Sequence, residues 1–186
     1  MAIILASASP RRQELLRNAG IPFLVRPTNI PEVQKPGERP RDFAERMARE
    51  KAQAAELHSP QDLVLAADTV VALDGQVLGK PENPADANRM LRLLSGQTHE
   101  VITGVCLRGS DFDDVRSEST KVQFLELSRE EVSNYVASGE PMDKAGAYGI
   151  QGVASKWISK IEGDYFNVVG LPVSLVWRML REHEAL

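Results

Sequence analysis

Apolar residues along the chain alternate between short continuous runs and runs with helical spacing. Residues 2–6, AIILA, form a short apolar run that predicts a buried strand. Ser9 and Pro10 follow, and this pair predicts a helix start, with serine as the N-cap and proline in the first turn. Gly20 marks the end of that helix. The N-terminal part therefore reads as strand, helix and then a further strand in FLVRP, residues 23–27.

The rest of the chain shows the same two patterns, with hairpins among them. We expect further strands at 63–73, 99–108, 119–127, 156–161 and 165–170, helices at 41–58, 84–95 and 128–138 and from 172 onward, a DG hairpin turn at 74–75, and a proline-rich loop at 28–40. Because hairpins interrupt the alternation of strands and helices, the sequence predicts an α/β fold with a mixed sheet.

The composition is that of an ordinary soluble domain. The chain has 186 residues, of which 42% are hydrophobic and 26% charged, so we expect one domain, with room for two lobes around a cleft. A net charge of -4 argues against general nucleic-acid binding. Cys106 is the one cysteine, which excludes an intramolecular disulfide and fits a reducing compartment. The apolar runs are too short for a signal peptide or a membrane span, so we expect a cytoplasmic protein without a membrane partner.

Common catalytic motifs are missing from the sequence. There is no phosphate-binding P-loop, no dinucleotide-binding glycine pattern and no nucleophile elbow, and the three histidines match no zinc spacing. The chemistry must therefore come from carboxylates, lysines and arginines. Carboxylate oxygens suit Mg²⁺ or Mn²⁺, whereas lysine and arginine suit phosphate.

Two arginines, Arg11 and Arg12, lie in the first turn of the first predicted helix. Cations there are unfavourable by about 0.3–1 kcal/mol each, because a helix N-terminus already carries partial positive charge. A bound anion would offset this cost. Backbone N–H groups, the hydroxyls of Ser7 and Ser9 and the two guanidinium groups together predict an anion site. The alternative is that both side chains reach surface carboxylates.

Asp68 follows the apolar run LVLAA. A carboxylate at the C-terminal end of a buried strand lies where ligands bind in open α/β sheets, and it could hold a metal or accept a proton from water. The alternative is a turn aspartate.

Four other residues gain meaning only in combination. Lys51 on a helix and Lys80 in a loop could each reach phosphate. The alternative for each is an ordinary lysine exposed to solvent, without a ligand. Glu32 in the proline-rich loop suggests nothing by itself. Gln151 lies among glycines, and its carboxamide could match the N3–H and O4 edge of uracil or thymine; the alternative is a polar loop residue.

Seven segments occur in the order seen in Maf-like proteins. They are LASASPRRQELL, EKA, AADTVV, GKP, MLRLLSGQTHEVITGV, DKAGAYGIQG and VVGLPV, and they span residue 3 to about residue 175. The sequence thus resembles the nucleoside triphosphate pyrophosphatases of that family, and AADT with DKAGAYGIQG resembles the branch that acts on dTTP and UTP. The resemblance implies hydrolysis of the triphosphate to monophosphate and pyrophosphate with a divalent metal, Mg²⁺ or Mn²⁺.

The resemblance also implies a fold and a set of residue roles. The expected fold is an elongated, twisted mixed sheet flanked by helices, as in inosine-triphosphate pyrophosphatase, with residues 1–186 forming a single Maf-like domain of two lobes around a central cleft. A homodimer is expected because family members often dimerise. The implied roles are proton acceptor and metal ligand for Asp68, a metal role for Glu32, phosphate binding by Ser7, Ser9, Arg11, Arg12, Lys51 and Lys80, and substrate choice by Arg11, Thr69 and Gln151. Arg11 is the expected selectivity residue of the arginine pair, and Arg12 the phosphate clamp.

A second reading, from another class of protein, is a regulator. The family has been linked with arrest of septum formation and cell division, so the nucleotide could act as a signal whose binding rather than hydrolysis matters. A carboxylate beside the phosphates discriminates between these readings, because a sensor needs no base there.

Overall fold

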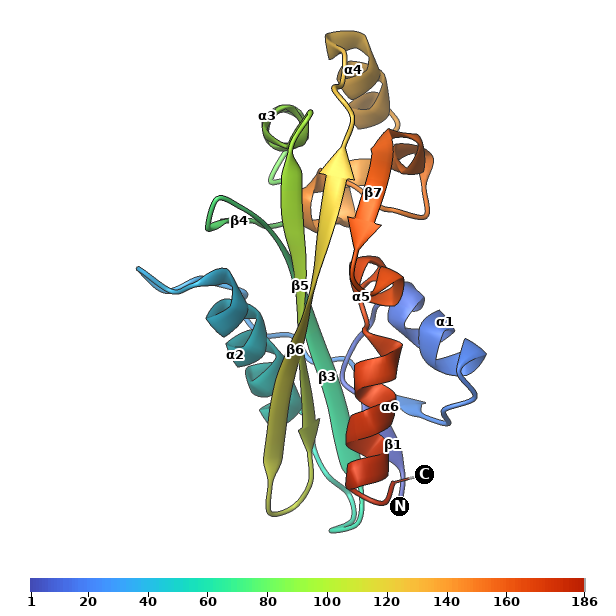
Figure 1. Ribbon diagram of the computed structural model, residues 1–186. Coiled ribbons are helices and arrows are strands. Elements are labelled where there is room, and N and C mark those ends of the chain that lie inside the picture. The colour runs from blue at the N-terminus through green and yellow to red at the C-terminus, as the bar shows by residue number, and fades with distance from the viewer. Residues whose placement is uncertain (186) are drawn as a thin grey trace. The chain divides into compact units, whose positions relative to one another are not determined.

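The fold is α/β, built on a seven-stranded mixed sheet with helices packed against it (Figure 1). The computed structural model describes residues 1–185. The sheet order is β2-β1-β3-β5-β6-β7, and β4 pairs with β3 outside this path. The pairs β1–β2 and β1–β3 are parallel, whereas β3–β4 and β6–β7 are antiparallel. The predicted fold class, including the mixed sheet, is confirmed.

The chain divides into two compact units. Among the described residues, unit 1 comprises 1–69, 103–118 and 170–185, and unit 2 comprises 70–102 and 119–169. Unit 1 contains β1 (Ile3–Leu5), α1 (Pro10–Asn18), β2 (Leu24–Val25), α2 (Pro40–Gln53) and α6 (Val173–Glu182). Unit 2 contains β4 (Gln76–Leu78), α3 (Pro84–Leu94), α4 (Arg129–Ala137), β7 (Ile158–Glu162), α5 (Tyr165–Val169) and the 3₁₀ helices η1 (Glu140–Asp143), η2 (Ala145–Ala147) and η3 (Val153–Trp157). Three of the four boundaries between the units fall within β3 (Leu63–Leu73), β5 (Thr98–Arg108) and β6 (Asp113–Phe124), and the fourth lies between α5 and α6, at residues 169–170.

Unit 1 contains a point where the strand order reverses. After β1 the chain passes through α1 to β2 on one side of β1, and then through α2 to β3 on the other side. Right-handed crossovers in opposite directions place their helices on opposite faces of a sheet. Figure 1 shows α2 on one side of these strands and α1 on the other. Open α/β sheets bind ligands at such a reversal, at the carboxyl ends of the strands.

The packing of α2 on the sheet depends on small residues. Ala48 and Ala52 of α2, together with Ala55 just after the helix, pack with apolar residues of β1, β3 and β5 in one buried cluster. Gly104 of β5 lies directly under α2, and a Cβ at that position would be 2.3 Å from the carbonyl oxygen of Ala44. Close approach of helix and sheet therefore requires glycine here.

Unit 2 has a core of its own, which is richer in aromatic residues. Met90, Leu91 and Leu94 of α3 pack with apolar side chains of α4 and of the neighbouring strands. Tyr135 and Trp157 meet edge to face with ring centroids 5.1 Å apart. These contacts hold the short 3₁₀ helices, which have few hydrogen bonds of their own, against the sheet.

Most predicted elements are present, and the local end signals are confirmed. Ser9 caps α1 through its side chain and Asn83 caps α3. Ser128 and Glu131 form the predicted capping box of α4. The hairpin between β3 and β4 turns at Asp74 and Gly75, both with positive φ as a two-residue hairpin turn requires.

Four predictions of local structure are wrong in type or bounds. The strand predicted at 119–127 is β6, which runs from Asp113 to Phe124. The segment 165–170 is not a strand but contains α5, because the Asp164 carboxylate accepts hydrogen bonds from the backbone N–H of Phe166 and Asn167 and so caps a helix. Helix α2 ends at Gln53 rather than near residue 58. Asp68 does not end its strand but lies inside β3, because the strand continues into the hairpin.

None of the helices in residues 1–185 is long and apolar enough to cross a membrane.

Substituting Gly104→Ala should destabilise the fold, because the new methyl group meets the backbone of α2 rather than a side chain that can move. Overpacking of this kind typically costs ~1–3 kcal/mol. Urea unfolding of the variant should show this loss in the free energy of unfolding. Gly79→Ala is the matched control, because a Cβ at Gly79 meets no atom within 4 Å. Equal stability of the two variants would contradict the packing argument.

Candidate active site

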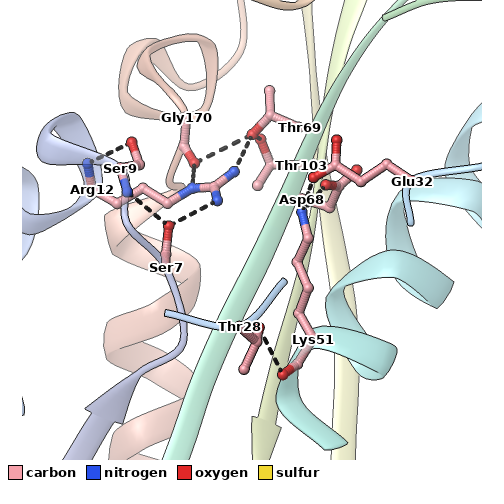
Figure 2. Close-up of polar contacts among 10 residues, drawn as sticks. All are labelled: Ser7, Ser9, Arg12, Thr28, Glu32, Lys51, Asp68, Thr69, Thr103 and Gly170. Carbon is pink, nitrogen blue, oxygen red and sulfur yellow. Dashed lines mark hydrogen bonds and ion pairs between the residues drawn. The ribbon is translucent and has the colours of Figure 1, made fainter. Parts of the chain in front are cut away.

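Asp68 and Thr69 are neighbours on β3 whose side chains lie on opposite sides of the strand (Figure 2). Alternation along a strand requires this. Asp68 shares a face with Val64 and Ala66, which pack in the cluster under α2, and it meets Lys51 from that helix. The Thr69 side chain faces the opposite way, and its hydroxyl oxygen accepts a hydrogen bond from Arg12 of α1. Strand β1 ends at Leu5, opposite Leu65, so β3 continues past it at this point. The two polar groups therefore lie at the strand-order reversal.

Lys51 joins two carboxylates. Its Nζ donates to Asp68 Oδ1 at 2.5 Å and to Glu32 Oε1 at 2.7 Å. The side chains of Lys51 and Asp68 are only 11% and 8% exposed, whereas that of Glu32 is 42% exposed. Burial raises the pKa of Asp68, and the Lys51 ammonium opposes that rise. A buried carboxylate is thus held beside a cation, with a second and more exposed carboxylate on the solvent side.

The proline-rich loop that carries Glu32 is attached to α2 by hydrogen bonds. Thr28 Oγ1 donates to the backbone carbonyl of Lys51 at 3.3 Å. Arg46 donates through Nη2 to the carbonyl of Val33 at 2.9 Å. Arg46 also bonds Glu38 at 2.6 Å and holds the pKa of that carboxyl at about 2. These contacts place Glu32 beside Lys51 although the loop has no regular secondary structure.

Arg12 connects three segments that are far apart in the chain. Its guanidinium donates from Nε to the Gly170 carbonyl at 2.8 Å, from Nη1 to Ser7 Oγ at 3.3 Å and from Nη2 to Thr69 Oγ1 at 3.1 Å. Burial lowers the pKa of Arg12 from its ordinary value, while the Asp68 carboxylate opposes this. Arg12 does not reach a surface carboxylate, which was the alternative. Its charge lies beside the start of α1, with all three nitrogens hydrogen-bonded to protein oxygens.

The start of α1 has the geometry expected of an anion site. Ser9 Oγ accepts from the backbone N–H of Arg12, and Ser7 Oγ accepts from the N–H of Ser9 at 3.2 Å. Arg11 is half-buried and lies close enough for its positive charge to contribute to the lowered pKa of Arg12. No acidic residue lies in the first turn of α1. The first turn of α1 therefore carries two cations and no acidic residue, which is the reverse of the usual preference at a helix start.

The structure brings seven of the predicted site residues together in unit 1: Ser7, Ser9, Arg12, Glu32, Lys51, Asp68 and Thr69. Arg11 joins them at the α1 start. Lys80 and Gln151 belong to unit 2, and both are exposed. Within unit 2 their segments are linked, since the N–H of Gly146 donates to the carbonyl of Gly79 at 3.0 Å.

Three groups of the site were missed from the residues alone. Thr103 Oγ1 lies 2.9 Å from Thr69 Oγ1 and is fully buried. The Gly170 carbonyl accepts a hydrogen bond from Arg12 Nε, at 2.8 Å, and another from the Thr69 hydroxyl, at 3.3 Å. Thr28 attaches the proline-rich loop to α2 through its hydrogen bond to the Lys51 carbonyl. Gly170 and Thr103 lie inside segments that carry the family resemblance, VVGLPV and HEVITGV, so that resemblance was a usable signal for these two.

An open α/β sheet with a cationic helix start and a buried Asp–Lys pair at its strand-order reversal is an arrangement suited to a phosphate-handling protein. The sequence matches the Maf-like protein family over residues 2–183, and the chain belongs to that family.

Relatives of known name resemble the chain over almost its whole length. A dTTP/UTP pyrophosphatase of Koribacter versatilis is 57% identical over 181 residues, which cover 97% of this chain and 94% of the relative. A dTTP/UTP pyrophosphatase of Syntrophomonas wolfei is 54% identical over 178 residues, covering 95% and 94%. One of Symbiobacterium thermophilum is 52% identical over 180 residues, covering 97% and 93%. The family predicted from the sequence motifs is confirmed.

Substituting Lys51→Met should destabilise the protein by about 3–5 kcal/mol, because it leaves the buried Asp68 carboxylate without its cation. Chemical denaturation monitored by circular dichroism measures this. The double variant Lys51→Met, Asp68→Asn should lose less than the sum of the two single losses, since no charge is then left unpaired.

The matched control is Lys160→Met, which removes an exposed lysine paired with the exposed Glu162. Such surface pairs contribute ~0–1 kcal/mol. A loss at Lys51 no larger than the loss at Lys160 would contradict the role given to burial.

Proposed function

We propose that this protein hydrolyses dTTP and UTP to the nucleoside monophosphate and pyrophosphate. The observation that carries the proposal is the buried Asp68–Lys51 pair, whose carboxylate lies close enough to Arg12 at the start of α1 to act on the pKa of that guanidinium. The names of the relatives with 52–57% identity support the same substrates.

The donor set suits a divalent metal that arrives with the substrate. Residues 1–185 contain no group of three or more His, Cys, Asp or Glu side chains placed to hold a metal ion. Mg²⁺ usually takes only one or two protein carboxylates and fills its other positions with water and substrate phosphate oxygens. Asp68 and Glu32, which meet at Lys51, are two such carboxylates. Mg²⁺ or Mn²⁺ held by Asp68 and Glu32 would neutralise phosphate charge.

The residues of the chain have distinct proposed roles in the reaction. Asp68 accepts a proton from the water that attacks the α-phosphorus, and the bond to the leaving pyrophosphate breaks. Lys51 keeps that carboxylate oriented by their hydrogen bond. Ser7, Ser9, Arg11, Arg12 and Lys80 bind the phosphates. Most of the catalysis is then positional and electrostatic.

Arg12 has a second part in this scheme. Because its guanidinium already bonds Ser7, Thr69 and the Gly170 carbonyl, Arg12 holds the loop before α1 against β3 and also contributes positive charge. Arg11, Thr69 and Gln151 select the substrate, with the Gln151 carboxamide reading the N3–H and O4 edge of uracil or thymine.

Asp68→Asn should keep the fold and lower kcat for UTP by ~100-fold or more, because the proton acceptor is gone. Pyrophosphate and orthophosphate release should be assayed separately, with Mg²⁺ and with Mn²⁺. Asp74→Asn is the control, because this turn residue is exposed and its positive φ also suits asparagine. A wild-type rate in Asp68→Asn would refute the role of Asp68. Orthophosphate as the direct product would indicate a phosphatase, and nucleotide-dependent thermal stabilisation without any release would favour the regulator.

Gln151→Ala should reduce the preference for UTP over CTP more than it weakens phosphate binding. The expected drop in the ratio of kcat/KM values is about three- to tenfold, the worth of about one hydrogen bond. Gln61→Ala, another exposed glutamine, should leave the ratio unchanged. An unaltered ratio in Gln151→Ala would remove this residue from base selection.

A further inference from the structure

Gln151 lies in a glycine-rich segment of unit 2 whose two ends are anchored. The segment runs from Gly146 to Gly152, and two of its glycines touch polar side chains from the preceding turn. A Cβ at Gly149 would lie 2.8 Å from Lys144 Cε, and a Cβ at Gly152 would lie 1.9 Å from Glu140 Oε1. The glycines thus serve close packing against Lys144 and Glu140, which makes the segment less free than its composition suggests.

The downstream anchor is the carboxylate of Glu140. Its Oε1 accepts a hydrogen bond from the backbone N–H of Val153 at 3.1 Å and another from the Tyr135 hydroxyl at 3.1 Å. Tyr135 is 3% exposed and packs edge to face on Trp157. Val153 is two residues after Gln151 and begins η3. The carboxylate therefore fixes the backbone directly after Gln151 to the core of unit 2.

The upstream anchor is the hydroxyl of Tyr148, three residues before Gln151. It lies 2.7 Å from Nε2 of His99, which is 2% exposed on β5, and the Tyr148 ring packs against Phe124. Burial lowers the pKa of His99 to about 4, so the ring is neutral near pH 7 and this contact involves no charge.

Between the anchors, the side chain of Gln151 is exposed while the neighbouring Ile150 is buried at 8% exposure. Only four residues separate Tyr148 from Val153. Such a short span leaves the backbone at Gln151 little room to shift while both anchors hold. Hydrogen bonds weaken steeply away from good geometry, so a carboxamide discriminates between bases only where its support is rigid.

We propose that Glu140 and Tyr148 are positioning residues for nucleobase selection, acting through Gln151. The inference rests on the proposed reading of the base by Gln151. Glu140 and Tyr148 need not touch the nucleotide. Their contribution is to hold the Gln151 backbone so that its carboxamide meets the base edge in one orientation.

The first test compares Glu140→Ala with Glu140→Gln and with the control Glu130→Ala, which removes an exposed glutamate from α4. The measured quantities are kcat/KM for UTP and for CTP, and the inhibition constant of inorganic triphosphate, which has no base. Glu140→Ala should lower the UTP-to-CTP ratio about three- to tenfold and leave triphosphate inhibition within about twofold. Glu140→Gln retains an acceptor oxygen and should recover most of the ratio, and Glu130→Ala should not change it.

Two further variants keep the test decisive if Glu140→Ala folds poorly. Gly152→Ala inserts a methyl group where the Glu140 carboxylate lies and should lower the ratio as Glu140→Ala does. Tyr148→Phe removes only the hydroxyl that is hydrogen-bonded to His99, and it should lower the UTP-to-CTP ratio as well. An equal loss of kcat/KM for UTP and for CTP, with triphosphate inhibition weakened to the same extent, would indicate a merely structural role and overturn the inference.

A double-mutant cycle separates this inference from the proposed function. In a Gln151→Ala background, Glu140→Ala should cause no further change in the ratio, because the side chain through which it acts is absent. A full further change in that background would overturn the inference and leave base reading by Gln151 intact. No change in Gln151→Ala alone would refute base reading itself, and with it the positioning role.

Discussion

The hydrogen-bonded pair of Asp68 and Lys51 is the constraint around which unit 1 is organised. A carboxylate that is 8% exposed needs a cation beside it, and Lys51 of α2 supplies that cation. Helix α2 must therefore lie close to the sheet, which explains its alanine face and the glycine at position 104. The second carboxylate, Glu32, reaches the same ammonium because the proline-rich loop is bonded to α2 at two points.

The opposite side of β3 is built on a second buried cation. Arg12 gives hydrogen bonds to Ser7 in the loop before α1, to Thr69 of β3 and to the carbonyl of Gly170 before α6, so it joins the N-terminal and C-terminal parts of unit 1. This explains why an arginine occupies the first turn of a helix, where its charge is unfavourable. Tertiary hydrogen bonds stabilise it there, and a bound triphosphate would add to this stabilisation.

Local signals in the sequence were reliable where a few neighbouring residues decide the conformation. The caps at Ser9, Asn83 and Ser128 and the turn at Asp74–Gly75 are of this kind. The segment YFNVV was misjudged because its β-branched and aromatic residues favour a strand, whereas the Asp164 cap and the bonds from the buried Asn167 amide to Val101 and Thr120 favour a helix. Val101 lies 66 residues and Thr120 47 residues away from Asn167 in the chain.

The sequence by itself determined the α/β class, the order of most elements, the family and the chemical type of the site, because periodicity, caps and motifs are local or ordered along the chain. Tertiary structure decided which charges meet. Asp68 and Thr69 are adjacent in the sequence, yet one joins the α2 cluster and the other the α1 cluster, since neighbouring side chains on a strand point to opposite faces. It also decided that Arg12 binds the protein itself and that the glycines around Gln151 serve close packing, because both depend on atoms brought near only by folding.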